Sequence, residues 1–551
     1  FMEDGFKLFT GGVLEKILKE TTRTVTKAIF SGFAATAVVQ SSSLVSVIAI
    51  SFLTAELIAL PQAIGIIFGS NIGTTVTAWL VSAFGLKINI AHYAMPMLVF
   101  GVLLRFSEKR SYKGLGNILL GLGFIFLGIS FMKDGFETLR SGIDLSRYAL
   151  GGIAGIGVYV FIGALATVII QSSSATMALI ITAVASGQIE YVNSISLAIG
   201  ANIGSTVTAI LGALTSNENG KRLAVAHLVF NVITALFAVV FIYPLIHTVD
   251  FLSGVLGVSE NDIAIKLTLF HTLFNVAGVL LVTPFIDRLV RFLNTLFIFK
   301  GERRGKPRYL DGEVVKASEP ALVAVHKETE HLYDNVSEII LRALYLRADD
   351  VYSQRNLAEV VGSLEGDSVD INKMYIEGIK NLYSSIIYYS TIAEQNMDDE
   401  ERRKIYKLKL ACRNIINAIK DIREIEKNIR YYRKVNNPSI KEEYNFLREN
   451  IAEILRDIDI MRNNPNDETL PARLEKAQER SKSFDVVTTK RLSDLLRDDK
   501  IGDTMATSLM NDGVYTTNII QKLIGSATVL WLNGGVLNQA TVEISLQESV
   551  T

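Results

Sequence analysis

The sequence predicts an all-helical (all-α) polytopic membrane protein with two inverted repeats, each with a re-entrant helical hairpin and a broken helix, plus a soluble helical bundle. Three observations lead to this fold class. A polar tetrapeptide occurs twice in apolar sequence, a second motif follows each copy at the same distance, and the composition changes near residue 300. Polar groups at membrane depth are tolerated where they line a cavity, so the motifs also mark a candidate functional site.

The tetrapeptide is Gln-Ser-Ser-Ser, at 40–43 and 171–174. The second motif is Gly-Ser-Asn-Ile-Gly-Thr-Thr at 69–75 and Gly-Ala-Asn-Ile-Gly-Ser-Thr at 200–206. Gln40 and Gln171 are 131 positions apart, as are Asn71 and Asn202, so the two copies keep register. Two halves of the membrane part that face each other would bring both copies to one solute site near the bilayer midplane.

A hexapeptide repeats as well, as Phe-Met-Glu-Asp-Gly-Phe at 1–6 and Phe-Met-Lys-Asp-Gly-Phe at 131–136. Its second copy closes an apolar helix expected from Leu115 to Met132, whereas nothing precedes the first copy, and the chain begins with Phe. We therefore expect that a transmembrane helix preceding residue 1 is missing.

Composition divides the chain into apolar, Gly-rich sequence up to about residue 300 and charged sequence beyond it. The apolar part contains many runs that could form the helix of about 20 residues that crosses a bilayer. The expected domains are repeat 1 with a connecting helix at 1–132, repeat 2 with the final helices at 133–299, a linker at 300–315, the bundle at 316–525, and a strand-like tail without assignment at 526–551. A net charge of −1 indicates no nucleic-acid partner, and the single Cys412 fits a reducing compartment.

Length predicts a hairpin for each tetrapeptide segment. A straight helix from Lys27 to Leu60 would exceed the hydrocarbon thickness of about 30 Å, whereas each arm beside the tetrapeptide is too short to cross. The predicted hairpin therefore has its tip at Gln40–Ser43, and the second hairpin has arms at Gly155–Ile170 and Ala175–Ser186.

The second motifs fall inside predicted spans at Gln62–Phe84 and Asn193–Leu214. An Asn, a Gly and two hydroxyls in mid-span predict a helix that is broken there.

Positive charge predicts the orientation, because Lys and Arg concentrate in short cytoplasmic loops. The basic residues lie before the first hairpin, between the repeats and after the last span: Lys16, Lys19, Arg23, Lys27, Arg105, Lys109, Arg110, Lys113, Arg288, Arg291, Arg303, Arg304 and Lys306. No basic residue falls in the stretch taken as external, Asp250–Asp262. With the basic segments inside, the two hairpins enter from opposite sides, so the repeats are inverted and the bundle is cytoplasmic at the plasma (inner) membrane.

Paired Gln-Ser-Ser-Ser motifs, each followed by Gly-x-Asn-Ile-Gly-Thr/Ser-Thr, resemble the type II sodium-phosphate cotransporter family over roughly residues 1 to 300. The resemblance implies sodium-driven uptake of inorganic phosphate, with the hairpin tips carrying the substrate. Charge-carrying animal relatives have an acidic residue after the histidine that corresponds to His92, but here Tyr93 follows, which leaves the sodium stoichiometry open.

Chemistry in the motifs agrees with this resemblance. Helix N-termini with serine hydroxyls can hold phosphate without Arg or Lys. The candidate phosphate-binding residues are Gln40, Ser41, Ser42, Ser43, Asn71, Gln171, Ser172, Ser173, Ser174 and Asn202. Neutral oxygens suit sodium, and the candidate sodium-binding residues are Gln40, Ser41, Thr74, Thr77, Gln171, Ser172, Ser205 and Thr208. Neither motif contains a carboxylate, which favours sodium over proton coupling.

Structural alternatives remain open for these residues. An isolated serine in a membrane helix is usually a packing residue, and Asn71 and Asn202 could serve helix-to-helix hydrogen bonding. His92, His227 and His271 lie in apolar helices, where a structural histidine is the commoner case.

The charged part reads as a helical bundle. Apolar residues recur at steps of three and four, at Ile415, Ala418, Ile422, Ile425 and Ile429 and again at Leu447, Ile451, Ile454 and Ile458. The pattern and its position resemble a PhoU-like domain. The metal motif of that family would map to Lys420–Glu424, where the first acid is replaced by Lys, so no metal is expected in the bundle.

The function predicted is sodium-coupled symport of inorganic phosphate by alternating access. The expected partners are inorganic phosphate, sodium and the lipid bilayer, with a homodimer as an option and no nucleic acid. No cofactor is expected apart from sodium as the coupling ion, and no catalytic residue is proposed, because no nucleophile-base pair is visible in the membrane part. A carrier for another oxyanion and a membrane phosphate sensor that signals through the bundle remain alternatives.

Overall fold

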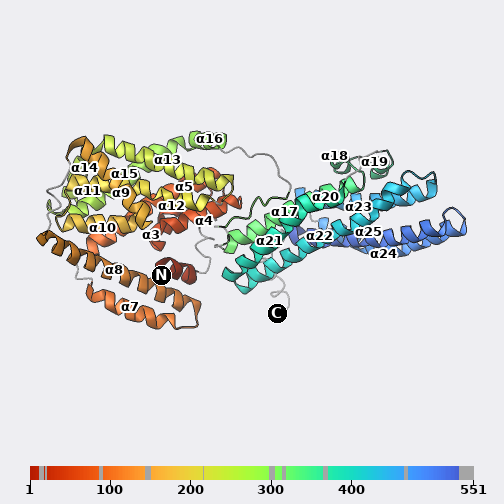
Figure 1. Ribbon diagram of the computed structural model, residues 1–551, viewed down its shortest axis with the longest axis horizontal. Coiled ribbons are helices and arrows are strands. Elements are labelled where there is room, and N and C mark those ends of the chain that lie inside the picture. Colours follow the sequence, from red (N-terminus) through yellow and green to blue (C-terminus); the bar gives the residue numbers. More distant parts are fainter. Residues whose placement is uncertain are drawn as a thin grey trace. The chain divides into compact units, whose positions relative to one another are not determined.

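Every regular element in the described part of the chain is a helix, which confirms the all-α prediction (Figure 1). The computed structural model describes residues 1–10, 18, 21–85, 91–142, 151–214, 216–296, 305–312, 315, 318–363, 370–464 and 469–532. Contacts divide the chain into two units, residues 1–300 with 311–320 and residues 301–310 with 321–551. Each unit is described by itself.

The first unit contains both copies of the repeated motifs. The elements up to the connecting helix are α1 (Met2–Thr10), α3 (Val25–Val39), α4 (Ser42–Thr54), α5 (Leu60–Gly73), α6 (Thr75–Trp79), the π-helix η1 (Leu80–Gly85), α7 (Ala91–Arg105) and α8 (Arg110–Gly142). The elements after it are α9 (Gly152–Ile170), α10 (Ser173–Ala185), α11 (Tyr191–Gly204), α12 (Thr206–Ala213), α13 (Glu218–Val240), α14 (Ile242–Val255), α15 (Ile263–Val282), η3 (Thr283–Phe285) and α16 (Ile286–Leu296). Helices α7 and α8 lie side by side (Figure 1).

Each tetrapeptide interrupts the helical chain, as the hairpin prediction requires. Helix α3 ends before Gln40 and α4 begins at Ser42, while α9 ends before Gln171 and α10 begins at Ser173. Both arms of the first hairpin, α3 and α4, are too short to cross, as the length argument requires, but the argument does not extend to the second hairpin. Helix α9 has 19 residues and is long and apolar enough to cross a bilayer by itself. Re-entrance of the hairpins therefore stays a prediction.

Close helix packing repeats in the two copies. A Cβ atom at Gly69 would lie 1.8 Å from the carbonyl oxygen of Ile29, and one at Gly200 would lie 1.9 Å from that of Val160. Only glycine permits such an approach of α5 to α3 and of α11 to α9. Because each contact recurs 131 positions later, the duplication extends from sequence to tertiary packing.

Both second motifs break their helices, as predicted. The backbone is interrupted at Thr74, between α5 and α6, and at Ser205, between α11 and α12. Hydroxyls of the motif donate to carbonyl oxygens three residues earlier, which competes with the regular helical bonds. These bonds are Thr74 to Asn71 (2.7 Å), Thr75 to Ile72 (2.8 Å), Ser205 to Asn202 (2.6 Å) and Thr206 to Ile203 (2.7 Å).

Six helical segments among the described residues are long and apolar enough to cross a membrane. They are Leu60–Ala83, Arg110–Thr138, Gly152–Ile170, Tyr191–Ala213, Glu218–Val240 and Ile263–Leu296. Large apolar side chains also cover the outside of this unit, including Phe161 at 67% exposure and Phe251 at 71%. An apolar exterior of this extent fits contact with lipid.

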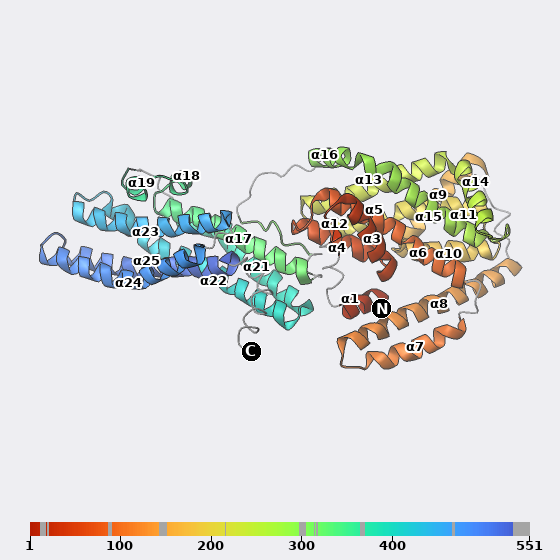
Figure 2. The ribbon, with the colours of Figure 1, turned by 180° about the vertical axis from the view of Figure 1, so that it is seen from behind.

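The second unit is a bundle of charged, amphipathic helices. Its elements are α17 (Ser318–Ala343), α18 (Ala348–Val351), α19 (Leu357–Ser363), α20 (Ile371–Met374), the π-helix η5 (Tyr375–Ile379), α21 (Lys380–Ala393), η6 (Glu394–Asn396), α22 (Asp399–Tyr432), α23 (Pro438–Asn463), α24 (Leu470–Arg497) and α25 (Asp503–Leu530). Figure 2 shows α22, α23, α24 and α25 running beside one another.

The bundle packs along the predicted apolar seams, whose residues on α22 and α23 are all buried. Asp398 begins α22 through a capping box with Glu401, and Asn437 caps α23. The strand-like interpretation from residue 526 was wrong at its start, because α25 continues to Leu530. Residues 533–551 lie outside the described chain.

Candidate functional site

The two tetrapeptides form the same sharp turn. Gln40 and Gln171 both adopt the left-handed conformation with φ of 57°, and each backbone N–H donates to a carbonyl four residues earlier, at 2.7 Å. A left-handed non-glycine residue costs about 1 kcal/mol or more. The identical conformation in both copies therefore indicates a backbone shape that the surrounding packing maintains.

The next residue begins the second arm of each hairpin. The Ser41 hydroxyl accepts the N–H of Leu44 and the Ser172 hydroxyl accepts the N–H of Ala175, both at 3.2 Å. These serines are N-caps, so the remaining tetrapeptide serines occupy the first turns of α4 and α10. The first N–H groups of a helix lack partners within it and carry the positive end of its dipole. Both turns are thus suited to an anion.

Exposure differs among the tetrapeptide residues. Ser43 and Gln171 are exposed, Ser173 is buried, and the remaining members are partly exposed: Gln40, Ser41, Ser42, Ser172 and Ser174. All of these residues except Ser173 are therefore at least partly exposed at the protein surface.

Thr77 joins the two copies. Its hydroxyl on α6 donates to the side-chain oxygen of Gln40 at 2.7 Å and lies 3.4 Å from the hydroxyl oxygen of Ser174. The structure thereby brings together three predicted site residues, from the first hairpin, the first broken helix and the second hairpin. This contact links the polar tips of both repeats.

The second copy lacks the corresponding contact. The Thr208 hydroxyl donates to the carbonyl of Ser205 in its own helix, at 2.8 Å. Gln171 is exposed and has no side-chain hydrogen bond within the described residues. The site is therefore asymmetric, with the Gln-Thr pair closed in copy 1 and separated in copy 2.

The helix breaks offer oxygen atoms to a cation. The Thr74 and Ser205 hydroxyls donate their hydrogen bonds to the backbone carbonyl oxygens of Asn71 and Asn202, as described above. Their oxygen lone pairs remain acceptors. Neutral oxygens of this kind suit a hard monovalent cation, and these two residues occupy equivalent positions in the two copies.

Asn71 and Asn202 are buried in a network that supports the alternative of helix-to-helix bonding. The amide nitrogen of Asn71 donates to the side-chain oxygen of Asn231 at 3.1 Å, and that of Asn202 donates to Asn275 at 2.9 Å. Asn231 in turn donates to the backbone carbonyl of Asn202 at 2.8 Å. Asn231 on α13 therefore contacts the broken helices of both copies.

Sequence reasoning missed Asn231 and Asn275, although a signal was present. Each lies in the same hexapeptide pattern, His-x-x-Phe-Asn-Val, at 227–232 and 271–276. The intervening Phe230 stacks on Phe68 with ring centroids 4.2 Å apart. Both ring nitrogens of the buried His227 lack hydrogen-bond partners within the described residues, so the structure assigns no polar contact to it.

Comparison with known proteins gives the following similarities. A family model described as Na+/Pi-cotransporter matches residues 1–134 and 155–256. YjbB of Escherichia coli (strain K12), named as a proposed inorganic phosphate export protein, is 27% identical over 406 residues, which cover 72% of this chain and 68% of YjbB. That alignment is longer than the first unit, so it extends into the helical bundle.

Two further relatives cover different shares of the chain. The YjbB protein of Salmonella typhimurium is 27% identical over 341 residues, covering 60% of this chain and 59% of the relative. YqeW of Bacillus subtilis (strain 168), an uncharacterized protein, is 30% identical over 278 residues, covering 49% of this chain and 84% of YqeW. No solved structure matches the chain.

Proposed function

Because the chain belongs to the Na+/Pi-cotransporter family, we propose that it is a secondary active transporter that carries inorganic phosphate across the membrane together with sodium ions. Membership of this family and the long apolar helices make it a membrane protein. The phosphate export named for YjbB supports phosphate as the substrate. The contact of Thr77 with both hairpin tips is the structural observation that carries the proposal.

Phosphate binds between the two hairpin tips in this proposal. Two helix N-termini supply backbone N–H groups and dipoles, and the serines of 41–43 and 172–174 supply hydroxyl donors. Asn71 and Asn202 act less directly, because their amides already hold the broken helices to α13 and α15. They stay in the proposed site as groups that fix its shape.

Sodium ions bind to the neutral oxygens beside the phosphate. The proposed ligands are Gln40, Ser41, Thr74 and Thr77 in copy 1 and Gln171, Ser172, Ser205 and Thr208 in copy 2. Bound sodium offsets the negative charge of phosphate in a poorly solvated site, so each ligand strengthens binding of the other. This electrostatic coupling is the physical basis of the proposed symport.

The asymmetry of the site supports alternating access. In this structure Gln40 is bonded to Thr77, while Gln171 is exposed and Thr208 is turned to its own helix. In a carrier built from two inverted copies, the opposite-facing state exchanges the conformations of the copies. We therefore expect a second state in which Gln171 contacts Thr208 and Gln40 is released.

Phosphate could be transported in either of two directions, into the cell or out of it. Uptake driven by an inward sodium gradient follows from symport, whereas the name of the YjbB relatives describes export. Export would require phosphate to leave without the inward sodium gradient as its driving force. In either case the proposed location is the plasma (inner) membrane, with a PhoU-like bundle on the cytoplasmic side and a homodimer as an option.

Labelled-phosphate flux in proteoliposomes tests the proposal. With purified protein, an inward sodium gradient should drive phosphate uptake, and Ser42→Ala and Ser173→Ala should each abolish it. Ser51→Ala is the matched control, because the Ser51 hydroxyl is buried in the same hairpin and donates to its own helix at 2.8 Å.

Three other outcomes would each support a different function. Phosphate counterflow that does not depend on the sodium gradient contradicts symport and favours sodium-independent export. Phosphate binding without any counterflow identifies a sensor. Preferential flux of sulfate or arsenate identifies a carrier for another oxyanion.

A further inference from the structure

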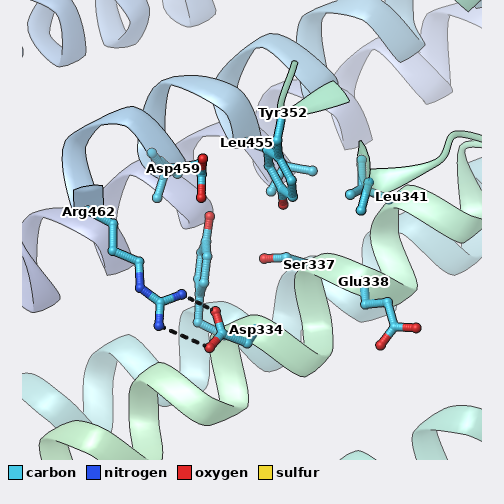
Figure 3. Close-up of a pocket in the computed structure, with 11 residues that line it drawn as sticks. Asp334, Ser337, Glu338, Leu341, Tyr352, Leu455, Asp459 and Arg462 are labelled. Carbon is cyan, nitrogen blue, oxygen red and sulfur yellow. Dashed lines mark hydrogen bonds and ion pairs between the residues drawn. The ribbon is translucent and has the colours of Figure 1, made fainter. Parts of the chain in front are cut away.

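The helical bundle contains a polar pocket between α17 and α23 (Figure 3). Its volume is about 220 Å³. One face of α17, one face of α23, helix α18 and Tyr352 form its walls. The lining residues are Tyr333, Asp334, Ser337, Glu338, Leu341, Ala348, Tyr352, Leu455, Ile458, Asp459 and Arg462. The pocket lies within one unit, apart from the repeated motifs.

One carboxylate in this pocket, that of Asp459, forms no direct ion pair among the described residues, because the guanidinium of Arg462 is bonded to Asp334. Asp334 forms a bidentate pair with Arg462, at 2.5 and 3.2 Å. Glu338 pairs with Arg342 at 2.5 Å, and its carboxylate points away from the pocket (Figure 3). Asp459 accepts only from the amide of Asn463, at 3.2 Å, and has no ion pair within the described residues. The pocket therefore carries a net negative charge.

Two buried hydroxyls accompany Asp459. Tyr333 and Ser337 are 5% and 3% exposed, and neither hydroxyl has a hydrogen-bond partner among the described residues. They lie near each other but outside hydrogen-bond geometry. Figure 3 shows Ser337 and Asp459 facing the same space. A buried hydroxyl without a partner is destabilising, and a bound ammonium group would give each of these two oxygens a hydrogen-bond donor.

We propose that this pocket binds a small primary ammonium compound. An ammonium group has three donors, which match the Asp459 carboxylate and the Tyr333 and Ser337 hydroxyls. The apolar walls, Leu341, Leu455 and Ile458, accommodate a short alkyl stem.

Other ligand classes fit the pocket less well. Phosphate would face the unpaired Asp459 carboxylate, and the guanidinium of Arg462 is already bonded to Asp334. A bare metal ion requires several oxygens at short fixed distances, whereas much of this pocket is apolar. Burial raises the pKa of Asp459, the positive charge of Arg462 opposes this rise, and the nearby Asp334 adds to it, so the pKa lies above its ordinary value.

The fluorescence of a tryptophan beside the pocket can report ligand binding. Of its two tryptophans, Trp531 lies with its ring centroid 4.9 Å from that of Tyr333, and the guanidinium carbon of Arg462 is 5.6 Å from the same ring. Trp79→Phe leaves Trp531 as the single tryptophan. Its fluorescence in the full-length, detergent-solubilised protein can be titrated with n-butylammonium chloride.

We expect a saturable change in Trp531 fluorescence with a dissociation constant of about 1 mM, because a ligand of five heavy atoms can make only a few contacts. Asp459→Asn should weaken binding at least about tenfold. Ser337→Ala should weaken it about three- to tenfold, and it provides a second test if Asp459→Asn does not fold. Glu442→Gln on α23 is the matched control and should leave the affinity within about twofold, because Glu442 is exposed and does not line the pocket.

Four results would overturn the proposal. They are no saturation with n-butylammonium, equal binding of the neutral 1-butanol, a response to inorganic phosphate or sodium chloride alone, and full retention of affinity in both pocket variants. Circular dichroism of each variant separates loss of binding from loss of fold.

Discussion

A single hydroxyl, that of Thr77, contacts both halves of the repeat. It donates to Gln40 and approaches Ser174, whereas its counterpart Thr208 bonds within its own helix. The two residues have the same chemistry and equivalent positions, so the difference between them reflects conformation. At the residue scale, the asymmetry of the site depends on this one hydrogen bond.

Replacing Thr77 with Val keeps the side-chain shape and removes the donor. We expect sodium-driven phosphate uptake to fall about fivefold, since the lost hydrogen bond is worth on the order of 1 kcal/mol. Initial rates in proteoliposomes measure the effect. Thr182→Val is the control, because that hydroxyl donates to Ala178 within α10 at 2.7 Å. Equal rates in the Thr77 variant and the control would contradict a role for this bond.

Asp512 in the bundle predicts a pH dependence. Burial raises its pKa to about 6, against the opposing effect of hydrogen bonds from Tyr444 (2.8 Å) and Asn428 (2.9 Å). The ordinary value is 3.8, so the folded state binds more protons than the unfolded state between about pH 4 and 6. Stability contributed by this group therefore falls as the pH rises through that window and stays lower above it.

Asp512→Asn removes this dependence and keeps an oxygen that accepts both bonds. We expect the variant to be more stable by roughly 2–3 kcal/mol above pH 6, with a flat profile across the window. Hydrogen exchange of α25 amides, corrected for the intrinsic rate, measures the difference at about pH 4.5 and about pH 7.5. A variant that keeps the wild-type pH dependence would refute the assignment.

Among the helices that the structure describes, α3 and α5 approach each other very closely, as do α9 and α11. Glycines at the crossing points allow one backbone to touch the other, and the same residues recur in both copies. The broken helices are held from the other side by Asn231 and Asn275. Each motif is thus fixed between a glycine contact and a buried amide.

Gly200→Ala tests the glycine contact. Its Cβ would lie 1.9 Å from the carbonyl oxygen of Val160, so α11 must move away from α9. We expect a loss of at least about 1–3 kcal/mol of stability, or no folded protein. Gly212→Ala on α12 is the control, since nothing lies within 4 Å of its added Cβ. Thermal unfolding in detergent compares the two variants. Equal unfolding midpoints would show that the contact of Gly200 with Val160 does not require glycine.

Asn231→Leu tests the amide network. The change leaves the amide of Asn71 and the carbonyl of Asn202 without this partner in a buried environment. A destabilisation of about 1–3 kcal/mol is expected. If thermal unfolding shows no loss, the network does not hold the broken helices in place.

Sequence alone predicted the hairpin arms, the broken helices and the apolar seams of α22 and α23, because the signals for these elements are local. The seam of α22, for example, follows from helical periodicity within one helix. The partners of Asn71 and Asn202 were not predicted, because they lie 160 and 73 positions away. The opposite states of Thr77 and Thr208 could not be predicted either, since two equivalent sequences carry no information about which copy is closed.

In the whole molecule, we propose, the two duplicated hairpins build one phosphate site between them. Neither tip alone surrounds an anion, whereas the contact through Thr77 brings them together. A shared site and two independent sites make different predictions for binding, even before transport is measured.

Equilibrium dialysis of the purified protein with labelled phosphate in saturating sodium distinguishes a shared site from two separate sites. With a shared site we expect one phosphate per chain, and loss of that phosphate in either Ser42→Ala or Ser173→Ala. Two phosphates per chain, with each substitution removing only one, would contradict it.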